Sequence, residues 1–203
     1  MFRSTRSLAA KVGGRSGARR LFVVLAMIMG GLTQLAPLRA TAQEQRSDIT
    51  VREERGVYSV TARFHVPQPS TVVLSVLTDY EGIPRFMPDI NTSVVLERAD
   101  GRAVVQQEAV SRVMLFSRRV HLVLEINEGA DTLRFNDRCG RSFVRYQGVW
   151  RVSGQNGMTE ILYELVAQPS FDVPEFLLKR VLRRNSEQMI EQLQREIAAR
   201  SAR

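Results

Sequence analysis

The chain has 203 residues and a formal net charge of +8. That length is enough for one domain with its own hydrophobic core. Residues 1–42 hold seven of the 29 basic residues and none of the 21 acidic ones. The other 22 basic residues (29 minus 7) nearly balance the 21 acidic ones, which argues against nucleic-acid binding by the rest of the chain.

The first 42 residues have the layout of a secretory signal peptide. Basic and small residues lead up to Arg20, an apolar run follows at 21–32, and the small-x-small tripeptide at 40–42 comes last. The run is short for a membrane span, which needs about twenty residues. We expect export by the Sec or the Tat route, with cleavage near Ala42 and a periplasmic location. An uncleaved N-terminal membrane anchor is the alternative.

Residues 43–48 form a polar leader, and the domain is expected to span 49–203. Apolar and polar residues alternate over 57–66, which predicts a half-buried strand. Ser70 is expected to cap a helix over about 71–80.

Gly82 and Pro84 are predicted to end this helix, with one more short turn over 83–87. Six further stretches have strand-like composition or period-two patterns, and turn residues separate them. They are 92–98, 103–116, 118–127, 131–137, 143–152 and 158–167. The alternation over 143–152 places Val144, Tyr146 and Trp150 on one face.

The chain closes with a predicted helix from about Asp172 to Ala199, in which Asp172 and Glu175 have capping-box spacing. Its apolar stripe consists of Leu178, Val181, Leu182, Met189, Leu193 and Ile197. An antiparallel sheet must bury its apolar face, and only this helix is long enough to cover it. The expected fold is therefore α+β: a curved antiparallel sheet of about seven strands wrapped round a long C-terminal helix, with two short helices after the first strand.

This order of elements and three segments, "VLTDYEGIPRFMP", "YQGVWRV" and "VPEFLLKRVLRR", resemble the START-like (SRPBCC) helix-grip superfamily. Within it the chain looks most like the polyketide cyclase/dehydrase and coenzyme Q-binding START group, over residues 50–200. The resemblance implies a deep apolar cavity between sheet and helix. Relatives hold lipids, quinones or polyketides there, some as aromatase/cyclases and others without chemistry, so the fold does not choose between these activities.

Patterns for catalysis and metal binding are missing from the sequence. Cys139 is the only cysteine, and His65 and His121 are predicted on polar strand faces. They do not supply the ligand cluster that a metal site needs, and no phosphate loop or nucleophile elbow is present. We therefore predict no disulfide, no metal, no cofactor and no catalytic residue.

Residues on the predicted inner faces are the ligand-binding candidates, although ordinary core packing is favoured for each of them taken singly. They are Phe64, Tyr80, Phe86, Met87, Phe135, Tyr146, Trp150, Tyr163, Leu178, Leu182, Asn185 and Met189. The tyrosines, the tryptophan and the asparagine could orient a ligand in a mostly apolar cavity. Residues 80–87 are expected to cover one end of the cavity. Arg112, Arg118 and Arg145 are predicted on outer, solvated faces; the alternative is an arginine in the cavity that binds a carboxylate or phosphate head group.

The leading interpretation is an exported, non-catalytic binding protein for a hydrophobic small molecule or lipid, such as a quinone, a fatty acyl chain or a polyketide-like compound. A cyclase/dehydrase-type enzyme acting on a hydrophobic carbonyl compound is one alternative. A protein-interaction module without ligand is another. The sequence does not favour nucleic acid as a partner, leaves transient membrane contact open and does not determine the oligomeric state.

Overall fold

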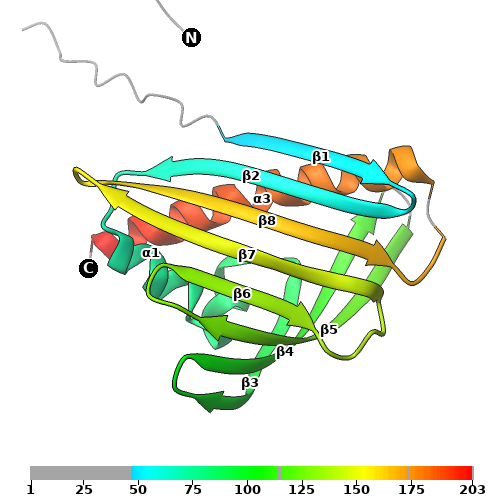
Figure 1. Cartoon of the computed structure of the whole chain (residues 1–203), viewed down its shortest axis with the longest axis horizontal. Helices are drawn as coiled ribbons and strands as arrows, with labels where there is room; N and C mark the ends of the chain where they lie inside the picture. Colours follow the sequence, from blue (N-terminus) through cyan, green and yellow to red (C-terminus); the bar gives the residue numbers. More distant parts are fainter. Residues whose placement is uncertain (1–46, 114–115, 173, 203) are drawn as a thin grey trace, which may run out of the picture. The chain divides into compact units, whose positions relative to one another are not determined.

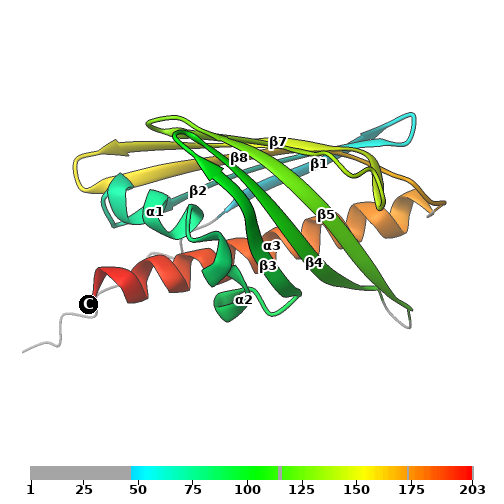
Figure 2. The same cartoon turned by 90° about the horizontal axis from the view of Figure 1, so that it is seen from below.

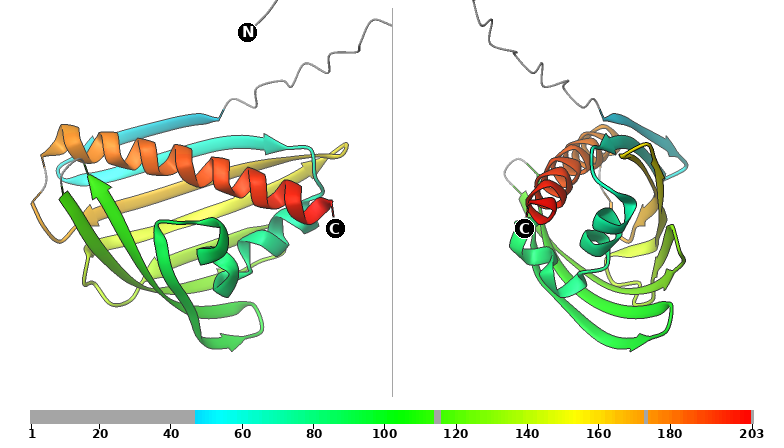
Figure 3. Two further views of the ribbon diagram at one scale, coloured as in Figure 1. Left: turned by 180° about the vertical axis from the view of Figure 1, so that it is seen from behind. Right: turned by 90° about the vertical axis from the view of Figure 1, so that its left-hand side faces the viewer.

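Eight antiparallel strands form one sheet that curves round the long helix α3 (Figures 1 and 3). The computed structural model describes residues 47–113, 116–172 and 174–202, so the predicted signal peptide lies outside it. The described residues belong to one compact unit, Ala42–Arg203. The predicted fold class is confirmed, with eight strands in the described residues where about seven were expected.

The elements follow the chain in a simple order. They are β1 (Asp48–Glu54), β2 (Val57–Val66), α1 (Ser70–Leu77), the 3-10 turn η1 (Tyr80–Gly82), α2 (Ile83–Phe86), β3 (Ile90–Ala99), β4 (Arg102–Val113), β5 (Phe116–Glu128), β6 (Thr132–Asp137), β7 (Phe143–Gln155), β8 (Met158–Pro169) and α3 (Glu175–Ser201). The strands lie in the order β1-β2-β8-β7-β6-β5-β4-β3, and each pairs with its neighbours in antiparallel fashion.

The strand β1 is the one that the sequence did not reveal, so the short helices follow the second strand rather than the first. Only Ile49 of β1 is buried, and four of its seven residues are charged. Burial does alternate along this edge strand, but only Ile49 and Val51 give the alternation an apolar face, which is too short a pattern to predict a strand. It pairs with β2 from Asp48 to Glu54, which adds it to the sheet at the end of the predicted leader.

Both predicted helix caps are wrong. Pro69 is the N-cap of α1 and Ser70 is its first residue, and no side chain caps this helix. At α3 the N-cap is Pro174, again without a side-chain cap. Glu175 forms an ion pair with Lys179 at 2.6 Å instead of closing a capping box. In both cases a proline fixes φ at the helix start and takes the capping position.

The core lies where α3 packs directly on the sheet (Figure 2). Alternate residues of β2, from Tyr58 to Val66, are buried, as the period-two pattern predicts. They meet the buried stripe of α3, which contains Ile190, Leu193 and Ile197. A straight helix cannot stay in contact with every strand of a curved sheet. Beyond β1 and β2 the two layers therefore separate.

Candidate functional site

A cavity of about 450 Å³ lies between α3 and the inner face of the sheet. Its walls come from α1, η1 and α2 on one side, from β4 to β8 on the other and from the middle of α3. This volume falls in the range of pockets that hold small organic ligands. The site is thus a space enclosed by nearly every element of the domain.

Five aromatic side chains form a continuous wall of this cavity. Trp150 and Tyr163 are register partners on β7 and β8, with ring centroids 4.3 Å apart. Phe135 on β6 lies 6.4 Å from Tyr163 and 5.9 Å from Tyr146. Phe143 completes the row at 4.8 Å from Tyr146. The wall offers a large flat apolar surface to a ligand.

A bulge in β7 decides which of its residues face the cavity. The register of β7 against β8 shifts between Phe143 and Arg145. Phe143 therefore lines the cavity together with Tyr146, whereas Val144 is 69% exposed. The strict alternation expected from the sequence placed Val144 inward, and that prediction is wrong because a bulge adds one residue to the strand.

Gly148 leaves the space that the Phe135 ring occupies in the aromatic wall. It lies on β7 between Tyr146 and Trp150, opposite Phe135 in register. A Cβ at this position would lie 2.5 Å from the Phe135 ring and closer still to the carbonyl oxygen of Glu164. Only glycine leaves room for the ring to lie flat on the strand.

The hydroxyl groups of Tyr146 and Tyr163 are polar groups within the aromatic wall. Burial raises the pKa of Tyr163 well above its ordinary value, and its charge and hydrogen-bond coupling to Tyr146 adds to the rise. Burial also raises the pKa of Tyr146, against the effect of its hydrogen bond with Tyr163. Both hydroxyls therefore stay protonated at neutral pH, and each carries one O–H group that can donate a hydrogen bond.

The Tyr80 hydroxyl is already engaged. It donates to Glu128 at 2.7 Å, and Arg98 lies 5.3 Å above the ring centroid. Burial, followed by the hydrogen bond to Glu128, raises the pKa of Tyr80 far above its ordinary value. Tyr80 therefore presents only its ring to the cavity.

The rest of the cavity wall is aliphatic, with amides near the opening. Leu122, Leu124 and Ile126 of β5 line it. Polar side chains come from Gln107 of β4 and from α3; they are Gln107, Asn185, Ser186, Gln188 and Gln192. Asn185 and Gln188 are exposed, so they mark the opening. Among the described lining residues none is basic, and the one carboxylate belongs to Asp89.

Ten of the twelve candidates from the sequence line the cavity. They are Tyr80, Phe86, Met87, Phe135, Tyr146, Trp150, Tyr163, Leu182, Asn185 and Met189. Their contact with a ligand stays a prediction. Phe143, Gln107 and the aliphatic residues of β4 and β5 also line the cavity without having been predicted, since only strand register and curvature bring them to the same space.

Phe64 and Leu178 do not line the cavity. Phe64 is 1% exposed and packs in the core, because β2 lies where α3 touches the sheet. Leu178 is half-buried near the beginning of α3, outside the lining. Of the arginines, Arg145 is exposed as predicted, and Arg118 lies 3.5 Å from the centroid of the Phe171 ring. The side chain of Arg112 lies outside the described residues.

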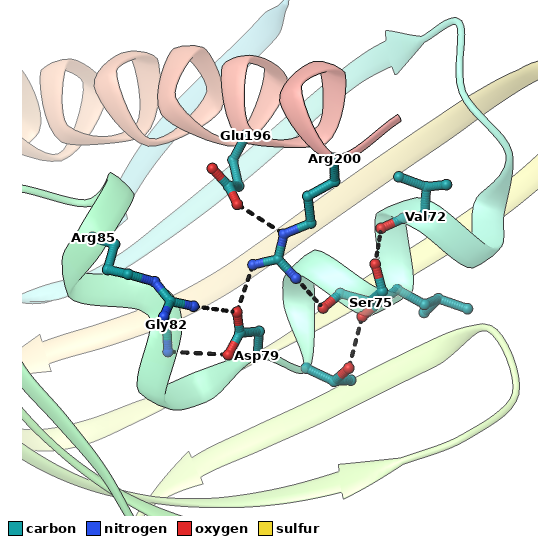
Figure 4. A network of polar contacts seen from close by, with 9 residues as sticks. Val72, Ser75, Asp79, Gly82, Arg85, Glu196 and Arg200 are labelled. Carbon is teal, nitrogen blue, oxygen red and sulfur yellow. Dashed lines mark hydrogen bonds and ion pairs between the residues drawn. The ribbon is translucent and has the colours of Figure 1, made fainter. Parts of the chain in front are cut away.

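A polar network fastens the segment 79–87 to the end of α3 (Figure 4). Asp79 accepts hydrogen bonds from Arg200 at 2.6 Å, from Arg85 at 2.9 Å and from the Gly82 backbone at 3.1 Å. Arg200 also donates to the Ser75 carbonyl at 3.0 Å and to Glu196 at 2.8 Å. Arg200 thus links the segment that closes one end of the cavity to the C-terminal end of α3.

The ionised form of Asp79 is favoured in the folded protein. Burial alone would raise the pKa of Asp79, but the hydrogen bond and charge of Arg200, the charge of Arg85 and the Gly82 backbone together lower it. A lowered carboxyl pKa contributes stability above the pKa of the unfolded chain, and this stability is lost as the pH falls through the folded value.

Arg200→Gln is expected to lower the free energy of unfolding at pH 7 by about 1 to 2 kcal/mol, between the values for exposed and buried ion pairs. The difference from the unchanged protein should shrink as the pH falls below the ordinary aspartate value of about 3.9. Urea unfolding at several pH values measures it. Arg195→Gln is the matched control, because Arg195 lies on the same helix and its side chain is 67% exposed. A difference that persisted at pH 2 would contradict the role given to Asp79.

Metal chemistry finds no support in the residues that the structure describes. No three of their histidine, cysteine, aspartate and glutamate side chains gather as metal ligands would. No helix in residues 47–113, 116–172 and 174–202 is long and apolar enough to cross a membrane.

Comparison with known proteins agrees with the helix-grip architecture. Residues 66–194 match the family described as "Polyketide cyclase / dehydrase and lipid transport", which is more than half of the chain. The chain belongs to this family. No curated protein matches the sequence.

Solved structures with the same fold include three bacterial proteins. A START superfamily protein from Mycobacterium smegmatis is 16% identical, with a TM-score of 0.61 over 70% of this chain and 97% of that one. The Zhui aromatase/cyclase from Streptomyces sp. R1128 is 17% identical, with a TM-score of 0.62 over 71% and 96%. A STAR-related lipid transfer protein from Xanthomonas axonopodis is 16% identical, with a TM-score of 0.57 over 74% and 98%. At these identities the likeness shows the fold of this polyketide cyclase/dehydrase family member and no activity.

Proposed function

We propose that this protein is an exported, non-catalytic binding protein for a hydrophobic small molecule or lipid. The observation that carries the proposal is the cavity of about 450 Å³ with a five-ring aromatic wall and aliphatic residues beyond it. Membership of a family described as acting in lipid transport supports it. Export rests on the signal-peptide layout of residues 1–42, and an uncleaved N-terminal anchor is the alternative to it.

A cavity of this kind can bind without charged contacts. A ligand that buries some ten methylene groups gains about 8 kcal/mol of transfer free energy, at about 0.8 kcal/mol for each, before the costs of association. The aromatic wall adds stacking for a ligand with a planar ring.

The polar groups of the wall favour a neutral ligand that carries a hydrogen-bond acceptor. No described lining residue is basic, so a buried carboxylate or phosphate would have no cation to pair with. The Tyr146 hydroxyl stays protonated and can donate to a carbonyl oxygen. A quinone or a polyketide-like ketone fits this wall better than a fatty acid anion does.

The test is native mass spectrometry and organic extraction of residues 43–203, followed by titration with a panel of quinones, cyclic ketones, fatty acids and phospholipids. We expect a bound apolar compound after purification and preference for the neutral carbonyl compounds. An empty protein that binds no member of the panel would reject the proposal.

Tyr146→Phe is expected to weaken binding of a ketone or quinone by about fivefold to tenfold, the value of one hydrogen bond. A hydrocarbon of the same shape should bind the variant and the unchanged protein equally. Isothermal titration calorimetry with the matched pair of ligands measures both affinities. Equal losses for the two ligands would mean that Tyr146 contributes packing alone.

A second candidate is a cyclase/dehydrase-type enzyme, and the tyrosine pair is the observation that favours it. A protonated tyrosine inside an apolar cavity can act as a general acid toward a ligand carbonyl. The two functions differ in the fate of the ligand: a binding protein releases it unchanged, whereas an enzyme releases a cyclised or dehydrated product. Mass analysis of a polyketide-like ketone after incubation separates them.

A further inference from the structure

The first half of α3 carries an exposed aromatic ring among unpaired arginines. Phe176 is the most exposed large apolar residue of those described, at 76%. Arg180, Arg183 and Arg184 follow it at intervals of four, seven and eight residues, which places them near Phe176 on the outer side of the helix. All three are exposed, and none forms an ion pair with another described residue. We call these four residues the basic aromatic surface.

Positive charge is concentrated at this surface and does not extend over the rest of the domain. The segment 175–184 holds four basic residues and one acidic one, and Glu175 is paired with Lys179 at 2.6 Å. The chain from residue 43 onward is close to neutral, with 22 basic and 21 acidic residues. Further along α3 the exposed positions alternate in sign, as in the pair Glu191 and Arg195. The arginines at the beginning of α3 therefore form a local cluster of positive charge, which the near-neutral composition of the domain does not explain.

The beginning of β5 places another arginine at the same end of the domain. Arg118 near the beginning of β5 lies over the ring of Phe171, with its guanidinium carbon 3.5 Å from the ring centroid. This contact brings β5 against the connection between β8 and α3. Figures 1 and 3 show the end of β4, the beginning of β5 and the N-terminal end of α3 at one end of the domain.

We propose that the basic aromatic surface docks this protein onto a bilayer that contains anionic lipids. An arginine binds lipid phosphates through its planar guanidinium, and each basic residue near an anionic bilayer contributes about 1 kcal/mol of attraction. A ring exposed to water beside them gains free energy by entering the boundary between head groups and acyl chains. Charge and apolar surface are here adjacent on one helix face, as interfacial binding needs.

Nucleic acid suits this surface less well. A single-stranded nucleic acid follows an extended basic groove with several stacking rings. Here one exposed ring and three arginines occupy about two helical turns, and the rest of the domain is near neutral.

Docking would also place the cavity at the membrane. Leu182 and Asn185 line the cavity, and they lie next to the arginines along α3. A ligand could then move between bilayer and cavity with little exposure to water. The surface itself lies outside the cavity, so docking goes beyond the proposed ligand binding and can be tested without a ligand.

The experiment is co-sedimentation of residues 43–203 with vesicles, because Ala42–Arg203 form a compact unit and the apolar run at 21–32 would bind bilayers by itself. We expect binding to vesicles of phosphatidylcholine with about a third phosphatidylglycerol, weakened by salt, and little binding to pure phosphatidylcholine. The variant R180Q/R183Q/R184Q should lose affinity by about fivefold for each arginine removed. Phe176→Ala should lose about tenfold.

The controls remove the same groups elsewhere. Arg195→Gln takes one charge from the same helix, and Leu96→Ala takes another exposed apolar side chain, 51% exposed on β3. Neither should change vesicle binding. Absence of binding to the anionic vesicles, or binding that both test variants retain, would overturn the proposal. So would tighter binding to an RNA or DNA oligonucleotide that the arginine variant abolishes and Phe176→Ala leaves unchanged.

Discussion

Ala109→Trp is expected to abolish ligand binding while the domain stays folded. Ala109 of β4 lines the cavity opposite α3 and pairs with Val120. An indole at this position would occupy space that the ligand needs, and we expect affinity to fall by about a hundredfold or more, since a ligand must lose several buried groups or be excluded. Because the ring enters an existing space, the free energy of unfolding should change by less than about 1.5 kcal/mol.

The measurement is titration with Nile red, an apolar fluorescent probe, and with any ligand recovered from the purified protein. Ala198→Trp is the matched control, since Ala198 is exposed on α3. It introduces the same side chain outside the cavity and should leave binding unchanged. If Ala109→Trp bound as tightly as the unchanged protein, the ligand would occupy some other site.

Gly148→Ala is expected to destabilise the protein by about 3 kcal/mol, at the upper end of the cost of overpacking. The added methyl group would overlap the Phe135 ring and the carbonyl oxygen of Glu164. The ring can move, but the carbonyl belongs to the neighbouring strand and is fixed by the sheet. We therefore expect the aromatic wall to distort, with loss of ligand affinity as well as stability.

Urea unfolding followed by tryptophan fluorescence measures this effect, because Trp150 lies two residues from the change on the same wall. Val144→Ala is the control on the same strand: its side chain points to solvent and should cost less than about 0.5 kcal/mol. A Gly148→Ala protein as stable as the control would show that β7 can shift away from β8 at little cost.

Most of the fold follows from local sequence periodicity. The alternation in β2 and the 3.6-residue stripe of α3 each indicate an element with one buried face, and the lengths of these elements allow few ways to join them. The strand β1 escaped detection because its charged residues leave Ile49 as its single buried position. The bulge at Val144 escaped because a bulge depends on pairing with β8, which lies further along the chain.

The sequence predicts an apolar cavity lined by aromatic residues, but it does not predict which of the inward-facing residues line that cavity. Phe64 and Tyr163 both lie on inward faces of neighbouring strands and both belong to the core, yet only Tyr163 also lines the cavity. The difference is set by where α3 leaves the sheet, a property of the curved sheet as a whole. Gln107 illustrates the same point, because nothing in the run Gln106-Gln107-Glu108 distinguishes the residue that turns inward.

The strand order has a consequence for how the chain folds. The hairpin of β1 and β2 joins the sheet only through β8, and Val60 pairs with Leu165, about a hundred residues later. Contacts so distant in sequence make folding slow, since the intervening loop must be closed before they form. The edge of β2 that pairs with β8 therefore stays open during synthesis until β8 has emerged, and the apolar face of β2 stays uncovered until α3 follows. A growing chain of this topology needs protection from aggregation through most of its synthesis.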